Sequence, residues 1–187
     1  MKNFILVLCT GIIASCSTSN SETVLNYRNA EANGDTVQMS AILRPSVKVD
    51  FTGSTDTFSR RDIMLNSVFS VPFNPSYELL RIDEVDEFTV LLEILETDDL
   101  KEALRIDSIR YKYTYKLKDS KIHSIVVDTL PDMNYNYQQL ETDYAKKMDE
   151  LMNYISINYP KEYQKIEDLD EEASQIMIKR AREKYGR

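Results

Sequence analysis

Residues 88–128 read FTVLLEILETDDLKEALRIDSIRYKYTYKLKDSKIHSIVVD, and this stretch decides the fold. The apolar run up to Thr97 predicts a strand, and the acidic start of the next segment predicts a short helix from Asp98 to Leu104. The residues that follow alternate at period two, which predicts a long strand. Its apolar face holds Ile109, Tyr111, Tyr113, Tyr115 and Leu117. Asp119-Ser120 then predicts a tight turn into an antiparallel strand. We therefore expect a sheet with one buried face and one face open to water or to a partner.

The other segments predict helices and strands that pack around this sheet. Val24–Ala32 predicts a helix that ends at Asn33-Gly34, and Asp35 predicts the cap of a second helix that Pro45 stops. Ser59 is a candidate cap for a third helix. The rest of the chain predicts strands at 47–51 and 77–85, a polar loop at 52–57, and helices around 140–155 and 170–185. This order of elements predicts an α+β fold.

The start of the chain resembles the export signal of a bacterial lipoprotein. Lys2 precedes an apolar run at 4–13 that is too short to cross a bilayer, and residues 13–16 read Ile-Ala-Ser-Cys, the pattern of a lipobox. The resemblance implies cleavage after Ser15 and acylation of Cys16, which would anchor the mature chain to a membrane. The alternative is an ordinary signal peptide that happens to contain a cysteine.

The lipobox divides the chain and implies its location. We expect a signal peptide at 1–15, the acylated cysteine with a flexible polar tether at 16–22, one domain at 23–130 and a helical extension at 131–187 that packs on it. The resemblance implies the bacterial cell envelope. The neutral Ser17 after the cysteine implies the outer membrane, under the sorting rule of enterobacteria.

Composition excludes several classes of function. Without Lys2 the chain has 22 basic residues (23 − 1) and 31 acidic ones, which gives a formal charge of −9. We therefore expect no nucleic-acid partner. Cys9 leaves with the signal and Cys16 would be acylated, so neither a disulfide nor a thiolate metal site is expected. His123 is the only histidine, and the chain has no glycine-rich phosphate loop and no EF-hand loop. We expect no metal and no cofactor.

Several motifs, taken in order, resemble the NTF2-like (SnoaL-like) superfamily. These are Tyr27–Asp35 with its Asn-Gly-Asp end, Val47–Gly53, the helix start Arg61-Asp62-Ile63, and the turn Asp-Ser-Lys-Ile at 119–122. The resemblance spans residues 23 to 187. It implies an NTF2-like cone, in which a curved, mostly antiparallel sheet wraps around N-terminal helices and a pocket, followed here by a C-terminal two-helix extension.

Ketosteroid isomerases within this superfold suggest candidate catalytic residues. Tyr27 and Asp50 stand at the positions of their first-helix tyrosine and first-strand aspartate, and Tyr113 stands where they have a further acid. The resemblance implies Asp50 as general base, with a pKa raised by an apolar cone, and Tyr27 as oxyanion donor. However, Asp50 lies on the strand face opposite Val47 and Val49, which predicts an alternative position in solvent.

Aromatic residues suggest a ligand pocket. Tyr27, Phe69, Tyr111 and Tyr113 come from segments that would surround one cavity, and such pockets bind small apolar molecules with a few polar anchors. A core filled by these rings is the alternative. Three hypotheses follow: non-catalytic binding of a small apolar ligand or protein partner, an isomerase or dehydratase, and an assembly role as a homodimer. The dimer would form through the sheet face of Arg110, Lys112, Thr114 and Lys116.

Overall fold

The structure of the chain is a computed structural model, which describes residues 19–51, 54–129, 137–166 and 170–186. The signal segment and Cys16 lie outside these residues. Helices and strands alternate in the first part of the chain and helices follow the sheet. The elements are α1 Asn20–Ala32, α2 Thr36–Ile42, β1 Leu43–Phe51, β2 Ser54–Ser59, α3 Arg60–Ser70, the 3-10 helix η1 Val71–Phe73, β3 Ser76–Asp86, β4 Thr89–Thr97, α4 Asp99–Ala103, β5 Ile109–Lys118, β6 Lys121–Thr129, α5 Tyr137–Asn158, α6 Pro160–Ile166 and α7 Glu171–Tyr185.

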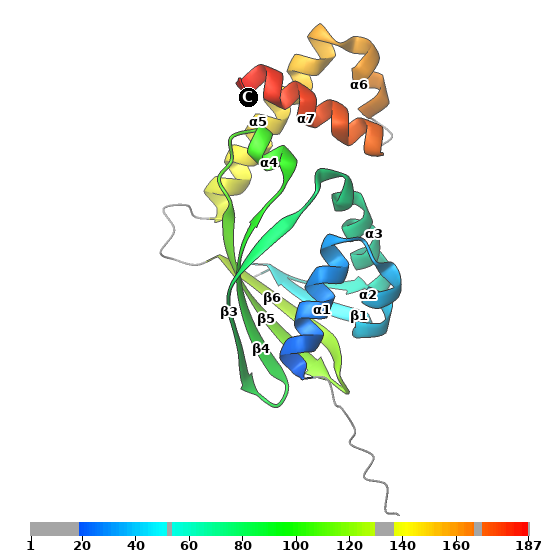
Figure 1. The fold of residues 1–187 in the computed structure, drawn as a ribbon, viewed down its shortest axis with the longest axis vertical. Coiled ribbons are helices and arrows are strands. Elements are labelled where there is room, and N and C mark those ends of the chain that lie inside the picture. Colours follow the sequence, from blue (N-terminus) through cyan, green and yellow to red (C-terminus); the bar gives the residue numbers. More distant parts are fainter. Residues whose placement is uncertain (1–18, 52–53, 130–136, 167–169, 187) are drawn as a thin grey trace, which may run out of the picture.

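A six-stranded sheet in the order β2-β1-β6-β5-β4-β3 forms the body of the molecule. Only the β1–β6 pair is parallel; the other pairs are antiparallel. The sheet curves around α1, and α2 and α3 lie beside it (Figure 1). The expected α+β architecture, a curved and mostly antiparallel sheet around N-terminal helices, is confirmed.

Strand β5 carries the centre of the core. Its burial alternates along the whole strand, and Tyr111, Tyr113 and Tyr115 are buried as their spacing predicted. The turn after it, Asp119-Ser120, has positive φ at both residues (53° and 57°), the conformation that closes a two-residue hairpin with the right twist. Opposite Lys116 and Leu117 the register shifts, which leaves His123 as the extra residue of a bulge in β6.

The junction of α1 and α2 packs closely against the end of α3. Gly34 has φ +65°, and a Cβ there would lie 2.7 Å from Cγ2 of Val71. Asp35 caps α2 as expected, because its carboxylate accepts the backbone N–H of Gln38. Helix α1 begins at Asn20, so it includes residues 20–22, which we had placed in the tether; Ser19 caps this start. These contacts fix the C-terminal end of α1 beside α3.

Residues 54–57, which we expected in a loop, form most of strand β2 instead. The strand pairs antiparallel with β1, with Val49 opposite Asp56 and Val47 opposite Phe58. The sequence did not predict this strand, because its residues are mostly serines and threonines. An edge strand is held by backbone hydrogen bonds and needs little apolar patterning. The next helix was predicted correctly: Ser59 and Asp62 form a capping box at the start of α3.

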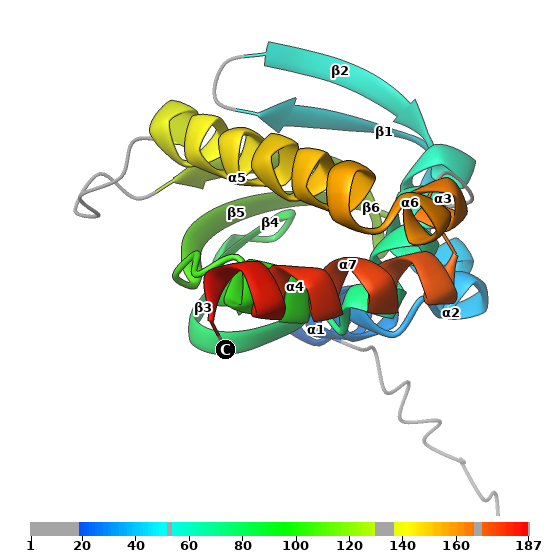
Figure 2. The ribbon, with the colours of Figure 1, turned by 90° about the horizontal axis from the view of Figure 1, so that it is seen from above.

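Three helices follow the sheet, where we expected two. Pro160 begins the additional helix α6, a position where its missing N–H costs nothing. Helices α5–α7 share a second hydrophobic cluster with α4, which includes Leu100, Leu104, Leu151 and Ile155. They lie across the end of the cone that holds α4 and η1 (Figures 1 and 2). Across the described ranges, none of the helices combines the length and apolarity that crossing a membrane requires.

Candidate functional site

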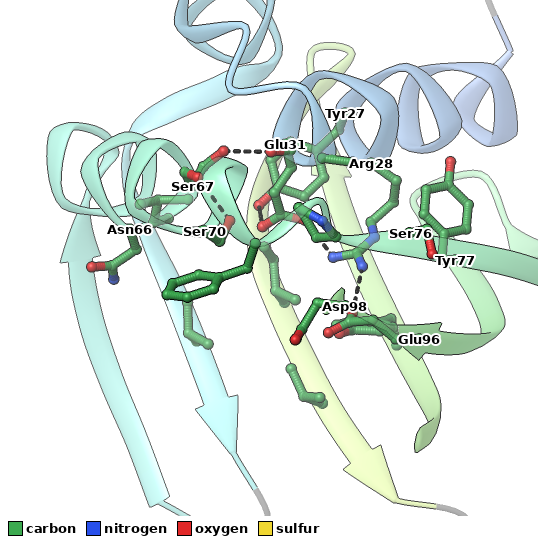
Figure 3. A pocket seen from close by; sticks show the side chains of 18 of the residues that line it. Tyr27, Arg28, Glu31, Asn66, Ser67, Ser70, Ser76, Tyr77, Glu96 and Asp98 are labelled. Carbon is green, nitrogen blue, oxygen red and sulfur yellow. Dashed lines mark hydrogen bonds and ion pairs between the residues drawn. The ribbon is translucent and has the colours of Figure 1, made fainter. Parts of the chain in front are cut away.

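A cavity of about 400 Å³ lies between the sheet, the C-terminal half of α1 and helix α3 (Figure 3). Apolar side chains from strands β1, β2 and β6, from helices α1 and α3 and from η1 form most of its walls. Polar and charged groups gather where α1 meets the ends of β4 and β3. The apolar lining residues are Ala32, Val49, Phe58, Ile63, Phe73, Pro75, Ile125 and Val127, and the polar ones are Tyr27, Arg28, Glu31, Asn66, Ser67, Ser70, Ser76, Tyr77, Glu96, Asp98, Lys101, Tyr113 and Tyr115.

Arg28 is the central charged group of this cavity. It is only 8% exposed, and its guanidinium pairs with Glu31 on the same helix and with Glu96 at 2.9 Å. The guanidinium also lies 4.7 Å from the ring centroid of Tyr113 and 5.6 Å from that of Tyr77. Burial alone would lower the pKa of Arg28, but Glu31, Glu96 and the neighbouring tyrosines together outweigh it and the pKa is raised. Arg28 is therefore charged, and its charge is balanced by the protein itself.

Lys101 adds a second cation at the rim. The Lys101 Nζ lies 3.0 Å from a carboxylate oxygen of Asp98 and 3.4 Å from one of Glu96. Burial would lower the pKa of Lys101, whereas Glu96 and Asp98 raise it, and the net shift is upward. The cavity thus holds two cations and three carboxylates, a formal excess of one negative charge. An anion would gain little here, because every cation already has a carboxylate partner.

Three tyrosines supply neutral hydroxyl groups. Burial raises the pKa of Tyr27, of Tyr113 and of Tyr115 above the ordinary value of 10.0. The Tyr27 hydroxyl donates to Glu31 at 2.8 Å. The Tyr115 side chain is fully buried and its hydroxyl lies near Arg28, but it makes no aligned hydrogen bond to any described residue. An unpaired buried hydroxyl is costly, and this one has almost no accessible surface.

These shifts predict how stability depends on alkaline pH. A tyrosine whose folded-state pKa is raised stabilises the fold fully below its unfolded pKa of about 10, and that contribution is lost as the pH rises through the folded value. We expect the free energy of unfolding to fall steeply above about pH 10. Urea titrations at a series of pH values measure this. Tyrosinate absorbance should show Tyr27, Tyr113 and Tyr115 ionising only with unfolding; their ionisation in the native state would contradict the assignment.

Two of the expected pocket residues line the cavity, and two do not. Tyr27 and Tyr113 face it, whereas Tyr111 is buried outside its lining. Phe69 is 54% exposed, because α3 turns Ile63, Asn66, Ser67 and Ser70 toward the cavity and places Phe69 on another face. Phe69 and Tyr111 are therefore not part of the lining of this cavity.

Asp50 lies beside the cavity wall but not in it. Its neighbour Val49 lines the cavity, and the alternation of a strand directs Asp50 to the other face of the sheet. Asp50 is half-buried and interacts with other groups of the protein. The structure therefore does not bring Asp50 together with Tyr27 in one site. The catalytic roles given to the two residues stay predictions.

Sequence reasoning missed the charged cluster. Helix α1 did contain a signal. Arg28 comes four residues after Val24 and one after Tyr27, and both of these residues are buried, so the sequence places a charged residue on the buried face of the helix. Glu96 and Lys101 carried no such signal, because they looked like ordinary strand-end and helix charges. Within the described part of the chain, no cluster of three or more His, Cys, Asp or Glu side chains is placed to hold a metal ion.

No family model and no curated protein matches the chain. Solved structures do. A ketosteroid isomerase-like protein from Kribbella flavida matches with TM-score 0.50 and 11% identity over 63% of this chain and 82% of its own. An uncharacterized cystatin-fold protein from Novosphingobium aromaticivorans matches with TM-score 0.50 and 12% identity over 60% of this chain and 99% of its own. This chain has the NTF2-like cone fold.

An NTF2-like protein of unknown function from Cytophaga hutchinsonii is also similar, with TM-score 0.49 and 14% identity over 63% of this chain and 95% of its own. Identities this low show the fold alone, because one cone fold hosts many unrelated activities. The chemistry of the NTF2-like cone in this chain must therefore be argued from its own cavity.

Proposed function

We propose that the protein is a lipid-anchored binding protein of the bacterial cell envelope, whose cone cavity holds a small, largely apolar molecule with a hydrogen-bond acceptor. The cavity of about 400 Å³ with its mostly apolar walls is the observation that carries this proposal. Tyr115 belongs to the lining, and its hydroxyl is the proposed donor to the acceptor once neighbouring side chains shift to admit it, because it has almost no accessible surface.

The volume and the charges of the cavity limit the kinds of ligand that can bind in it. A volume of about 400 Å³ falls in the range of ordinary small-molecule pockets. Arg28 and Lys101 are already paired with carboxylates, so the cavity favours a neutral ligand over an anionic one. An acceptor oxygen that meets Tyr115 would fix one end of the ligand. The apolar remainder would lie against Val49, Ile125 and Val127.

The envelope location rests on the lipobox at Cys16. Acylation there would hold the mature domain at a membrane surface, and the neutral Ser17 favours the outer membrane. The apolar stretch before the cysteine supports export.

The other hypotheses have less support. An isomerase or dehydratase would need Asp50 in the cavity, and Asp50 is not among the lining residues. A homodimer through the sheet would use the face of Arg110, Lys112 and Thr114, and a measurement of molar mass in solution tests it. On that same face Arg110 already pairs with Glu93 at 2.9 Å.

A neutral fluorescent probe tests the binding function. Nile red is apolar, carries a carbonyl acceptor and brightens when it leaves water. We expect the protein to bind it at micromolar concentration. Val127→Phe, which adds a ring to the buried cavity wall, should weaken binding by about tenfold or more. Val37→Phe is the matched control, because Val37 is 81% exposed and outside the lining. Equal binding by both variants, or none by the wild type, would remove the support for a ligand cavity.

A further inference from the structure

The start of α1 is fastened to the hairpin between β3 and β4. The side-chain amide of Asn20 donates to the carbonyl of Glu87 at 2.8 Å, and the backbone N–H of Ser21 donates to the carboxylate of Glu84 at 2.8 Å. The Ser19 hydroxyl caps the same helix end. The hydrogen bond from Ser21 lowers the pKa of Glu84. The helix therefore begins at a fixed place, beside the tip of this hairpin (Figure 1).

The acylation site is close to that place along the chain. Asn20 is four positions after Cys16, and even a fully extended chain spans about 14 Å over four residue steps. Acyl chains on Cys16 would therefore begin within about 14 Å of the start of α1. Because the start of α1 contacts Glu84 and Glu87, a bilayer that holds these chains lies near the hairpin tip.

The hairpin tip carries two exposed apolar side chains. Val85 is 57% exposed and Phe88 is 54% exposed. They flank the turn at Glu87, in which the Asp86 carboxylate accepts the backbone N–H of Phe88 at 2.8 Å. A phenylalanine at the tip of a hairpin gains nothing in water, whereas it gains free energy at the boundary of a bilayer.

We propose that the β3–β4 hairpin tip, with Val85 and Phe88, enters the interface of the membrane that holds acylated Cys16. This inference rests on the envelope anchoring proposed above. Insertion of the hairpin tip would fix the orientation of the protein on the membrane. The contacts of Asn20 and Ser21 set the tip against the lipid surface, and the axis of α1 leads away from it.

The orientation places the ligand cavity away from the bilayer. Helix α1 rises 1.5 Å per residue, so Glu31 lies about 16 Å along the helix from Asn20. The cavity is built around that far end of α1, and α5–α7 lie beyond it (Figure 1). Ligand would then reach the site from the aqueous compartment, and the bilayer would not cover it.

Charge at the tip selects the kind of lipid surface. Glu84, Asp86 and Glu87 are the sequence neighbours of the two apolar residues in this hairpin. Anionic headgroups would repel these carboxylates at low salt. The tip therefore suits a zwitterionic surface, such as phosphatidylcholine or phosphatidylethanolamine.

The chain has no tryptophan, so a single substitution creates a clean reporter. The full chain would be expressed in a host that acylates lipoproteins, checked by mass at Cys16, and placed in phosphatidylcholine vesicles that contain brominated lipid. We expect the Phe88→Trp protein to show blue-shifted emission and quenching several times stronger than Ile157→Trp. Ile157 is the matched control, since it is 69% exposed and lies on α5, beyond the cavity.

The outcomes separate the two claims. An acylated protein whose Phe88→Trp emission is not quenched, or is quenched no more than that of Ile157→Trp, overturns the orientation and leaves the anchoring intact. A measured mass without acyl chains on Cys16 overturns both the anchoring and this inference. Ligand binding by the cavity is then tested separately, with Nile red.

Discussion

Arg28→Met is expected to lower the free energy of unfolding by about 3 to 5 kcal/mol, as does the removal of one partner from other buried ion pairs. The substitution leaves the carboxylate of Glu31, which is 27% exposed, without its cation, and it leaves Glu96, which is 22% exposed, with Lys101 alone. It also removes the guanidinium from the face of Tyr113. Urea denaturation near neutral pH measures the loss.

Two controls separate this effect from a general loss of charge. Arg81→Met removes an arginine that pairs with Asp83 at a more exposed site, where the side chain of Arg81 is 64% exposed, and it should cost less than about 1 kcal/mol. Arg28→Met combined with Glu31→Gln should recover part of the loss, because the carboxylate that lost its cation disappears. Equal effects of Arg28→Met and Arg81→Met would show that the buried cluster does not stabilise the fold.

Tyr115→Phe is expected to change stability and affinity in opposite directions. Removing a buried hydroxyl that has no aligned partner should leave the fold equally stable or raise the free energy of unfolding by about 1 kcal/mol. Nile red should bind between about tenfold and a hundredfold more weakly, because its acceptor oxygen would lose its donor. Denaturation and probe titration measure the two effects.

Tyr77→Phe is the matched comparison for the sign of the stability change. The Tyr77 hydroxyl donates to Asn29 at 2.7 Å, so its removal should lower the free energy of unfolding, by about 1 kcal/mol. If Tyr115→Phe destabilises the protein as much as Tyr77→Phe does, the Tyr115 hydroxyl has a partner within the protein. If affinity for the probe is unchanged, that hydroxyl is not the anchor.

The elements that sequence alone predicted are those with local causes. The alternation of Tyr111, Tyr113 and Tyr115 determined the buried face of β5, and the caps at Asp35 and Ser59 marked two helix starts. Each of these signals lies within a few residues of the feature that it predicts. The expected cone architecture followed from the order of such elements.

The remainder depends on contacts between distant parts of the chain. Strand β2 is held by backbone pairing to β1, and its polar side chains gave no periodic signal. Arg28 and Glu96 are 68 residues apart, so their ion pair depends on how the sheet curves. Phe69 was misplaced because the rotation of α3 is set by packing against α1 and η1. Of the residues proposed for the site, Tyr27 and Tyr113 line the cavity, whereas the charged residues Arg28 and Glu96 were not proposed.

A crystal structure of the protein grown with Nile red tests the central claim most directly. The account predicts probe density in the cavity at the C-terminal end of α1, with the probe carbonyl within hydrogen-bond distance of the Tyr115 hydroxyl and its rings against Val49 and Val127. A cavity closed by its own side chains, or a probe bound only elsewhere on the protein, would contradict the claim that this cone is a ligand-binding site.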